Sequence, residues 1–125
     1  MRYVILFCCV LLTIPTIATQ EKQYDRKYDL FDIETLVQNP RLLRKYMDCF
    51  LDQGPCTPIG RVFKLALPEI IITRCGKCTP AQKSFARRTF DAFKRELPEQ
   101  HAELKKLLDP NNKYYDSFEK AVASA

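Results

Sequence analysis

The chain has 125 residues, of which 20 are Lys or Arg and 15 are Asp or Glu, giving a formal net charge of +5. A chain of this length predicts a single domain that can fold around its own core. The basic residues are scattered among acidic ones, without the concentrated basic face that a nucleic-acid-binding protein needs. We therefore expect no nucleic-acid partner.

The first predicted element is a secretory signal peptide over residues 1–18. After a basic start, an apolar run extends from Val4 to Ile14, and small residues follow up to Ala18. This run is too short to span a bilayer and is typical of a cleaved leader. We therefore expect a secreted, extracellular protein in which residues 19–125 form one domain, without stable insertion into a membrane.

The same two-residue signal for the start of a helix, a capping residue followed by proline, occurs repeatedly in the sequence. The capping side chain accepts an orphan backbone N–H, and proline lacks the N–H that would otherwise be unpaired. Residues 20–31 are predicted to be extended. These starts and the apolar periodicity predict an all-α chain of six short helices at 32–38, 40–52, 58–74, 80–96, 98–108 and 112–122. The starting pairs are Asn39-Pro40, Thr57-Pro58, Thr79-Pro80 and Asp109-Pro110.

Four of these helices carry further expectations. Pro68 removes a hydrogen bond from the helix at 58–74 and is predicted to kink or divide it. The helix at 80–96 is apolar over more than half its circumference, so we expect it to be central. In the last two helices, the side chains predicted to point inward are Leu104, Leu107 and Leu108, and then Tyr114, Tyr115, Phe118 and Val122.

Four cysteines remain after the leader: Cys49, Cys56, Cys75 and Cys78. Four cysteines allow three pairings, and the sequence alone does not choose among them, although the short spacings favour bridges between neighbours. The last two could also be a thioredoxin-like redox pair, but no predicted strand precedes them. A zinc site is a further alternative. Secretion and the six residues between Cys49 and Cys56 argue against it. We therefore expect structural disulfides and no metal or cofactor.

The cysteine spacing and several short phrases closely resemble the arthropod chemosensory proteins, also called olfactory-specific-D-like or ejaculatory bulb-specific proteins. The phrases are Asn39-Pro-Arg-Leu-Leu43, Leu51-Asp-Gln-Gly-Pro-Cys-Thr-Pro58 and Lys77-Cys-Thr-x-x-Gln-Lys83. The resemblance implies a compact bundle of six short helices around an apolar channel, with bridges Cys49–Cys56 and Cys75–Cys78. It also implies binding of long-chain alcohols, esters and fatty-acid-like semiochemicals, without catalysis.

The resemblance also implies which residues contact the ligand. Tyr28 and Asp29 fall at the mouth of the channel, and the residues along it are Leu36, Leu43, Tyr46, Gln82, Phe85 and Thr89. Taken alone, Tyr46 also fits a plain core position, and Gln82 fits a capping box with Thr79. His101, the only histidine, stands where the family often has Trp. We expect it to be partly exposed, with a role in pH-dependent ligand release as the alternative.

Two functions of different classes remain. The resemblance favours a monomeric secreted carrier that binds and solubilises hydrophobic small molecules in an internal channel. The alternative is a secreted protein-interaction or developmental signalling factor that uses the same fold with a solid core or an incidental cavity. The sequence contains no paired catalytic carboxylates or phosphate-binding loop, so we do not expect an enzyme.

Overall fold

The computed structural model describes residues 23–125, so the signal peptide predicted over residues 1–18 lies outside the described part. Within residues 23–125 the chain contains helices and no strand. The elements are the 3-10 helix η1 (Arg26–Leu30) and the α-helices α2 (Ile33–Gln38), α3 (Pro40–Phe50), α4 (Pro58–Ile72), α5 (Pro80–Glu96), α6 (Pro98–Leu108) and α7 (Tyr115–Val122). The six predicted α-helices are confirmed, with ends shifted by a few residues. No helix in this part of the chain is both long and apolar enough to cross a bilayer.

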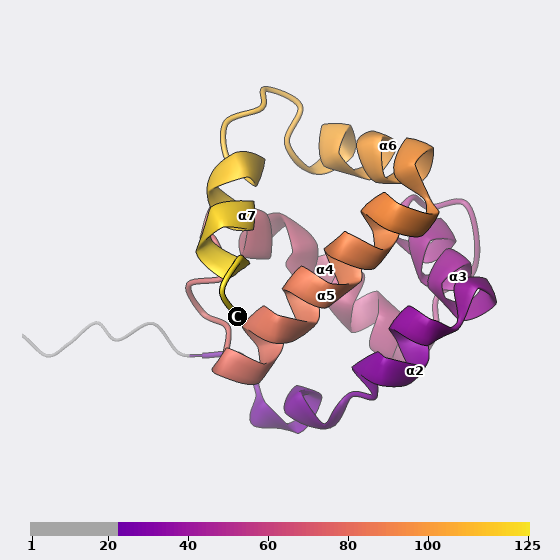
Figure 1. The fold of residues 1–125 in the computed structure, drawn as a ribbon, viewed down its shortest axis with the longest axis horizontal. Helices are drawn as coiled ribbons and strands as arrows, with labels where there is room; N and C mark the ends of the chain where they lie inside the picture. Colours follow the sequence, from indigo (N-terminus) through magenta and orange to yellow (C-terminus); the bar gives the residue numbers. More distant parts are fainter. Residues whose placement is uncertain (1–22) are drawn as a thin grey trace, which may run out of the picture.

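Helix α5 is the central element of the fold, as its wide apolar surface predicts. It crosses the middle of the molecule in Figure 1, with α7 to the left, α2 and α3 to the right, and α4 behind it. It packs directly against η1, α2, α3, α6 and α7. Helix α4 instead packs mainly against α3, α6 and α7. The two longest helices therefore face each other with little direct contact between their backbones.

The helix starts predicted from a capping residue and proline are confirmed at three positions. The side chains of Asn39, Thr57 and Thr79 accept hydrogen bonds from backbone N–H groups of the following turn, at 3.1, 3.0 and 3.2 Å. At α5 the Gln82 side chain in turn accepts a hydrogen bond from the Thr79 N–H at 3.1 Å, which completes the capping box. These local bonds fix where α3, α4 and α5 begin.

Asp109 does not start a helix, which corrects the prediction of a helix from Asn112. The carboxylate of Asp109 accepts three backbone N–H bonds of 2.9 Å, from Lys113, Tyr114 and Tyr115. The chain therefore makes a turn first, and α7 begins only at Tyr115. Burial opposes ionisation of this carboxyl group, but the three N–H bonds outweigh it and hold the pKa of Asp109 below its usual value.

Two further expectations about the backbone need correction. Helix α4 is one continuous helix through the exposed Pro68, so the proline does not divide it. Residues 26–30, expected to be extended, form the 3-10 helix η1. The Asp25 side chain starts this turn by accepting the Lys27 N–H at 2.9 Å. The N-terminal segment is therefore folded back onto the bundle.

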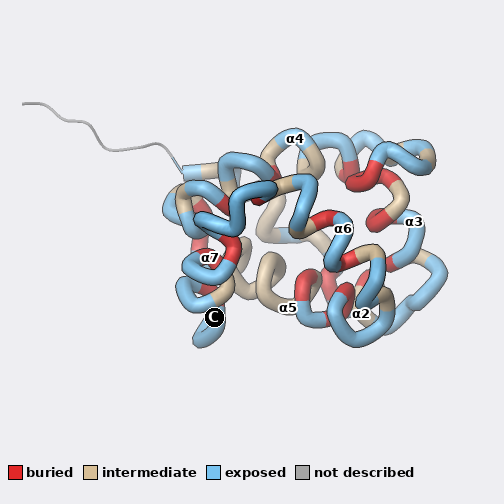
Figure 2. The backbone as a smooth tube through the Cα atoms, turned by 90° about the horizontal axis from the view of Figure 1, so that it is seen from above, coloured by how far each residue is buried: buried red, intermediate tan, exposed pale blue. Residues whose placement is uncertain are grey.

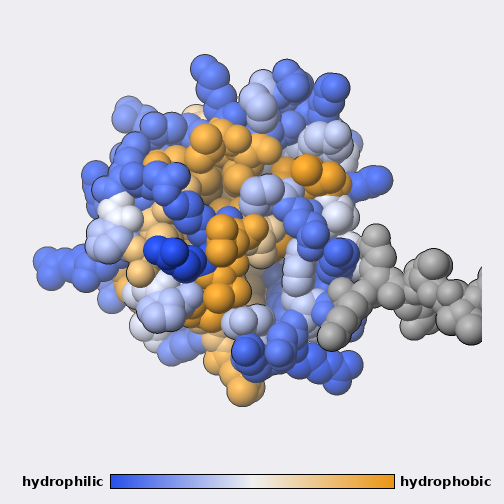
Figure 3. Space-filling view, turned by 180° about the vertical axis from the view of Figure 1, so that it is seen from behind, coloured by the Kyte–Doolittle hydropathy of each residue, from blue (hydrophilic) through white to orange (hydrophobic). Residues whose placement is uncertain are grey.

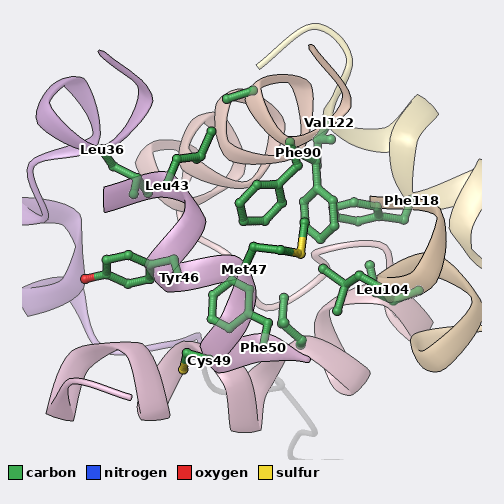
Figure 4. Packing of buried hydrophobic residues seen from close by; sticks show 14 of the residues in the cluster. Leu36, Leu43, Tyr46, Met47, Cys49, Phe50, Phe90, Leu104, Phe118 and Val122 are labelled. Carbon is green, nitrogen blue, oxygen red and sulfur yellow. The ribbon is translucent and has the colours of Figure 1, made fainter. Parts of the chain in front are cut away.

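The core lies where α3, α5, α6 and α7 meet, and it is rich in aromatic rings. Figure 4 shows their side chains gathered around Met47, which is fully buried. Phe90 contacts the rings of Phe93, Tyr115 and Phe118 edge-on, with centroids 5.4–5.9 Å apart. Such aromatic contacts add to the free energy gained by burial of apolar area. These four rings are buried and packed against one another.

Two side chains predicted to point inward do not. Leu107 is 59% exposed and Tyr114 is 42% exposed. Leu104 and Tyr115, beside them in the predicted inward sets, are fully buried. Tyr114 is displaced because it belongs to the turn that Asp109 holds, and α7 begins one residue later.

The two disulfides pair neighbouring cysteines, Cys49 with Cys56 and Cys75 with Cys78, as the family resemblance implied. The first bridge closes the connection from α3 to α4, and the second closes the connection from α4 to α5. At the second corner, Arg74 and Cys75 both have left-handed backbone conformations. Each bridge therefore fixes one corner next to α4 and does not join distant helices.

Candidate functional site

A cavity of about 130 Å³ lies between α4 and α5. Helix α4 contributes an apolar stripe with helical spacing to one wall: Val62, Phe63, Ala66, Leu67 and Ile70. Helix α5 contributes the opposite wall with the same kind of spacing: Gln82, Phe85, Ala86, Thr89 and Phe90. This hollow explains why the two helices share little direct packing.

The exposure pattern of α5 agrees with a hollow beside it. All residues from 81 to 89 have intermediate exposure (tan in Figure 2), whereas Phe90, Ala92 and Phe93 are buried. A helix half packed against a solid core has fully buried positions at every turn. The N-terminal half of α5 has none because the cavity runs along it.

Aromatic side chains of the N-terminal segment cover the cavity. The ring of Phe31 packs edge-on against Phe63, with centroids 5.1 Å apart, and against Phe85, at 6.4 Å. The ring of Tyr28 meets Phe63 in the same way at 6.1 Å. These contacts connect residues 24–31, which we call the N-terminal cover, to both walls of the cavity.

Hydrogen bonds hold the N-terminal cover against the corner between α4 and α5. The Tyr24 hydroxyl donates to Glu69 at 2.7 Å, and the Tyr24 backbone N–H donates to the carbonyl of Lys77 at 3.0 Å. Further along, the Thr79 hydroxyl donates to the carboxylate of Asp29 at 2.7 Å. No residue of η1 is fully buried. The cover is thus held largely by polar contacts, which exchange with water more readily than a packed core.

The Tyr24–Glu69 bond shifts the ionisation of both groups. Burial and the neighbouring carboxylate raise the pKa of Tyr24 above its ordinary value. The bond from Tyr24, followed by the nearby Lys77, lowers the pKa of Glu69. Glu69 therefore stays ionised, and its charge is already shared between a hydroxyl and the Lys77 ammonium group, which lies 3.4 Å away.

The polar groups of the cavity fall into two sets. The polar groups of Gln82 and Tyr24 already have partners. The Gln82 side chain accepts from the Thr79 N–H and donates to the carbonyl of Asp25 at 2.9 Å, and the Tyr24 hydroxyl donates to Glu69. The hydroxyls of three other lining residues make no hydrogen bond to any residue of the described chain: Tyr28, Tyr46 and Thr89. No Lys, Arg or His among residues 23–125 lines the cavity. The site is therefore an almost entirely apolar space without a cation.

Residues 24–116 match the model of the insect pheromone-binding family A10/OS-D. The chain belongs to this family. Its relatives include the allergen Tha p 1 of Thaumetopoea pityocampa, which is 38% identical over 101 residues, covering 81% of this chain and 80% of that protein. Ejaculatory bulb-specific protein 3 of Drosophila melanogaster is 32% identical over 116 residues, covering 93% of this chain and 90% of that protein.

Two solved structures share the fold. A chemosensory protein in complex with bromo-dodecanol superposes with a TM-score of 0.70 and 31% identity, covering 78% of this chain and 98% of that one. The antennal chemosensory protein A6 from the moth Mamestra brassicae superposes with a TM-score of 0.64 and 30% identity, covering 81% and 94%. The all-α fold and the membership in a family of chemosensory binding proteins agree with the resemblance found in the sequence.

The structure of this A10/OS-D family member brings together six of the eight residues that the sequence analysis placed in the channel. They are Tyr28, Leu36, Tyr46, Gln82, Phe85 and Thr89, and all of them line the cavity. The other two lie outside its wall. Asp29 is bound to the Thr79 hydroxyl, and Leu43 is fully buried in the core.

Several lining residues were missed, chiefly Phe31 and the stripe on α4. The α4 residues were not assigned to the channel, although the spacing of Val62, Phe63, Ala66 and Ile70 at i, i+1, i+4 and i+8 marks one face of a helix. Phe31 carried no such signal, because nothing in residues 20–31 indicates that the segment folds back over the bundle.

His101 is buried, which corrects the expectation of partial exposure. It is 8% exposed, and its Nε2 lies 2.7 Å from the hydroxyl oxygen of Tyr115. His101 does not line the cavity, but the Phe90 ring that packs against it does. Within residues 23–125, no group of three His, Cys, Asp or Glu side chains is placed to hold a metal ion.

Proposed function

We propose that this chain is a secreted carrier that binds hydrophobic small molecules with a long alkyl chain in the cavity between α4 and α5. The observation that carries the proposal is the cavity itself, because a space lined by aliphatic and aromatic side chains stays dry and takes up apolar molecules. Each buried methylene group of a ligand contributes about 0.8 kcal/mol. A related chemosensory protein in complex with bromo-dodecanol supports the same class of ligand.

We also propose roles for the residues named in the sequence analysis. Tyr28, Leu36, Tyr46, Gln82, Phe85 and Thr89 contact the ligand, since all of them line the cavity. Asp29 acts indirectly by accepting the hydrogen bond of the Thr79 hydroxyl, and Leu43 acts indirectly by packing α3 into the core. Cleavage of residues 1–18 and export fit a domain with two disulfides, which persist in oxidising compartments.

The cavity must enlarge to hold a long chain. An engineered cavity of about 150 Å³ holds benzene, so the 130 Å³ found here accommodates only part of an alkyl chain. The side chains best placed to yield are Tyr28 and Phe31 of the N-terminal cover, because polar contacts hold most of their segment. We infer that the ligand enters between this cover and α4.

Filling the cavity tests the proposal. The Ala66→Trp variant places a large ring in the space from the α4 wall. We therefore expect it to lose binding of a fluorescent N-phenyl-naphthylamine probe, which we expect dodecanol to displace from the wild type. Leu65→Trp is the matched control, because Leu65 is the next residue on the same helix and is 74% exposed. Circular dichroism checks that both variants fold. Equal probe binding by two folded variants would contradict the cavity as the site.

One observation favours the alternative function, a protein-interaction factor. Figure 3 shows apolar surface gathered over α4 on the face seen from behind. On α4 the exposed apolar side chains include Val62, Leu65 and Ile72. An exposed apolar face is typical of a protein contact when it is large and continuous. If no hydrophobic compound of any chain length displaced the probe from a folded protein, this second function would be preferred.

A further inference from the structure

We propose that the cavity discriminates by head-group charge, favouring an uncharged alcohol or ester over the ionised carboxylate of the same chain length. The inference rests on the proposed function, since it assumes that the cavity binds amphiphiles. It concerns the polar ends of the ligand, whereas the apolar walls accept any alkyl chain of suitable length.

The first argument is the charge of the wall. No Lys, Arg or His of the described chain lines the cavity. An ionised carboxylate that leaves water needs a cationic partner or several hydrogen-bond donors to offset its lost hydration. A hydroxyl or an ester oxygen needs only one hydrogen bond. The wall can therefore satisfy a neutral head group but not an anionic one.

The second argument is that three cations next in sequence to lining residues already have partners. The Lys77 ammonium lies 3.4 Å from Glu69, and the Arg88 guanidinium pairs with Glu34. The ammonium of Lys27 lies 5.2 Å from the centre of the Tyr28 ring, where it is attracted to the ring face. A ligand carboxylate at the mouth would have to compete with these partners.

The third argument is that some lining residues carry a hydroxyl without a partner in the described chain. Thr73, the residue that follows α4, is a threonine whose hydroxyl already has a partner, because it donates to the carbonyl of Glu69, four residues back, at 2.7 Å. The hydroxyls of Thr89, Tyr28 and Tyr46 make no hydrogen bond within the described chain. Each hydroxyl both donates and accepts, which matches an alcohol and also an ester carbonyl.

Displacement of the N-phenyl-naphthylamine probe by three matched compounds tests the proposal near neutral pH, below their micellar concentrations. We expect dodecanol and methyl dodecanoate to bind at least about tenfold more tightly than dodecanoate, which corresponds to about 1.4 kcal/mol. Equal affinity of dodecanoate and the methyl ester would overturn this inference and leave the carrier function intact. If none of the three displaced the probe, both proposals would fail.

Variants of the wall give a second readout. Among Tyr28→Phe, Tyr46→Phe and Thr89→Val, each of which removes only a hydroxyl, we expect at least one to weaken dodecanol binding several-fold while probe affinity is kept. Ser84→Ala is the control, since Ser84 lies on the same helix outside the cavity wall. Unchanged dodecanol affinity in all three would overturn the inference.

Thr89→Lys adds a cation to the wall and should narrow or reverse the preference against dodecanoate, whereas Ser84→Lys should not. If a folded Thr89→Lys variant kept the wild-type preference, charge at the wall would not be what discriminates, and the inference would be overturned. The hydroxyl deletions remain decisive if this variant does not fold.

Discussion

Nε2 of His101 lies 2.7 Å from the hydroxyl oxygen of Tyr115, and this pair joins α6 to α7 inside the aromatic core. Phe90 of α5 packs edge-on against both rings. Burial, and then the positive charges of Lys94 and Lys105, lower the pKa of His101 from 6.5 to about 4. The imidazole is therefore neutral near pH 7, with Nε2 free to accept a hydrogen bond from the tyrosine.

The low pKa of His101 makes stability depend on pH. The unfolded chain takes up a proton on this residue near pH 6.5, whereas the folded chain resists protonation until about pH 4. The contribution of His101 to the free energy of unfolding is therefore fully present above pH 6.5. As the pH drops toward 4, the free energy of unfolding falls by about 2 to 3 kcal/mol. Urea unfolding at a series of pH values measures this change.

The variant His101→Gln does not titrate and keeps a group that can accept from Tyr115. We expect it to lose most of the pH dependence between 6.5 and 4. Any loss of stability that remains below pH 4 is due to protonation of carboxylates such as Asp109, whose pKa is lowered in the folded protein. A His101→Gln variant with the full wild-type pH dependence would show that another group is responsible.

Removal of the Tyr115 hydroxyl leaves the buried Nε2 of His101 without its partner. We expect Tyr115→Phe to lower the free energy of unfolding by about 1 to 2 kcal/mol, as for other buried polar groups that lose a hydrogen bond. Tyr114→Phe is the matched control, because this neighbouring tyrosine is exposed and should change stability by less than about 0.5 kcal/mol. Equal effects of the two substitutions in urea unfolding would contradict the importance of the buried pair.

Asp109 should be the most sensitive residue of the turn before α7. Asp109→Ala removes the acceptor for three backbone N–H groups, so we expect a loss of more than about 2 kcal/mol. Asp116→Ala, which removes only an exposed pair with Lys105 at 3.7 Å, should change stability by less than about 0.5 kcal/mol. Amide hydrogen exchange should also rise selectively in α7, and unchanged exchange there would speak against the proposed anchoring.

The N-terminal cover should loosen when its hydrogen bond to α4 is removed. In Tyr24→Phe the ring still lines the cavity but no longer binds Glu69. We expect trypsin to cleave faster after Arg26 and Lys27, and bound dodecanol to slow this cleavage. Tyr114→Phe again serves as the control. Cleavage at the wild-type rate in Tyr24→Phe would indicate that the hydroxyl bond does not hold the cover.

The sequence was sufficient where the signal is local. Each of the three helix caps accepts a hydrogen bond from a backbone N–H only three residues ahead, so the neighbouring sequence is enough to predict it. These caps are Asn39, Thr57 and Thr79. Asp109 looks the same in the sequence as these caps, but its carboxylate reaches four to six residues ahead. The difference depends on how the turn packs, which no pattern in the adjacent residues records.

The cavity was only partly predictable, since its walls come from residues far apart in the chain. The residues taken from the family resemblance lie mostly on α2, α3 and α5, and six of the eight line the space. The α4 stripe could have been found from its spacing. Burial of His101 depends on Tyr115 and Phe90 meeting it from two other helices, which is a tertiary property without a sequence signature.

The positions of the two disulfides have a consequence for how the cavity can change size. Cys49–Cys56 lies just before α4 and Cys75–Cys78 just after it, so both ends of this helix are covalently restrained. Neither bridge crosses from α4 to the opposite wall on α5. A bowing of the middle of α4 away from α5, near the hydrogen bond that Pro68 lacks, would therefore strain neither covalent cross-link. Oxidation of the four thiols thus sets where the helix is anchored and leaves the width of the gap to non-covalent contacts.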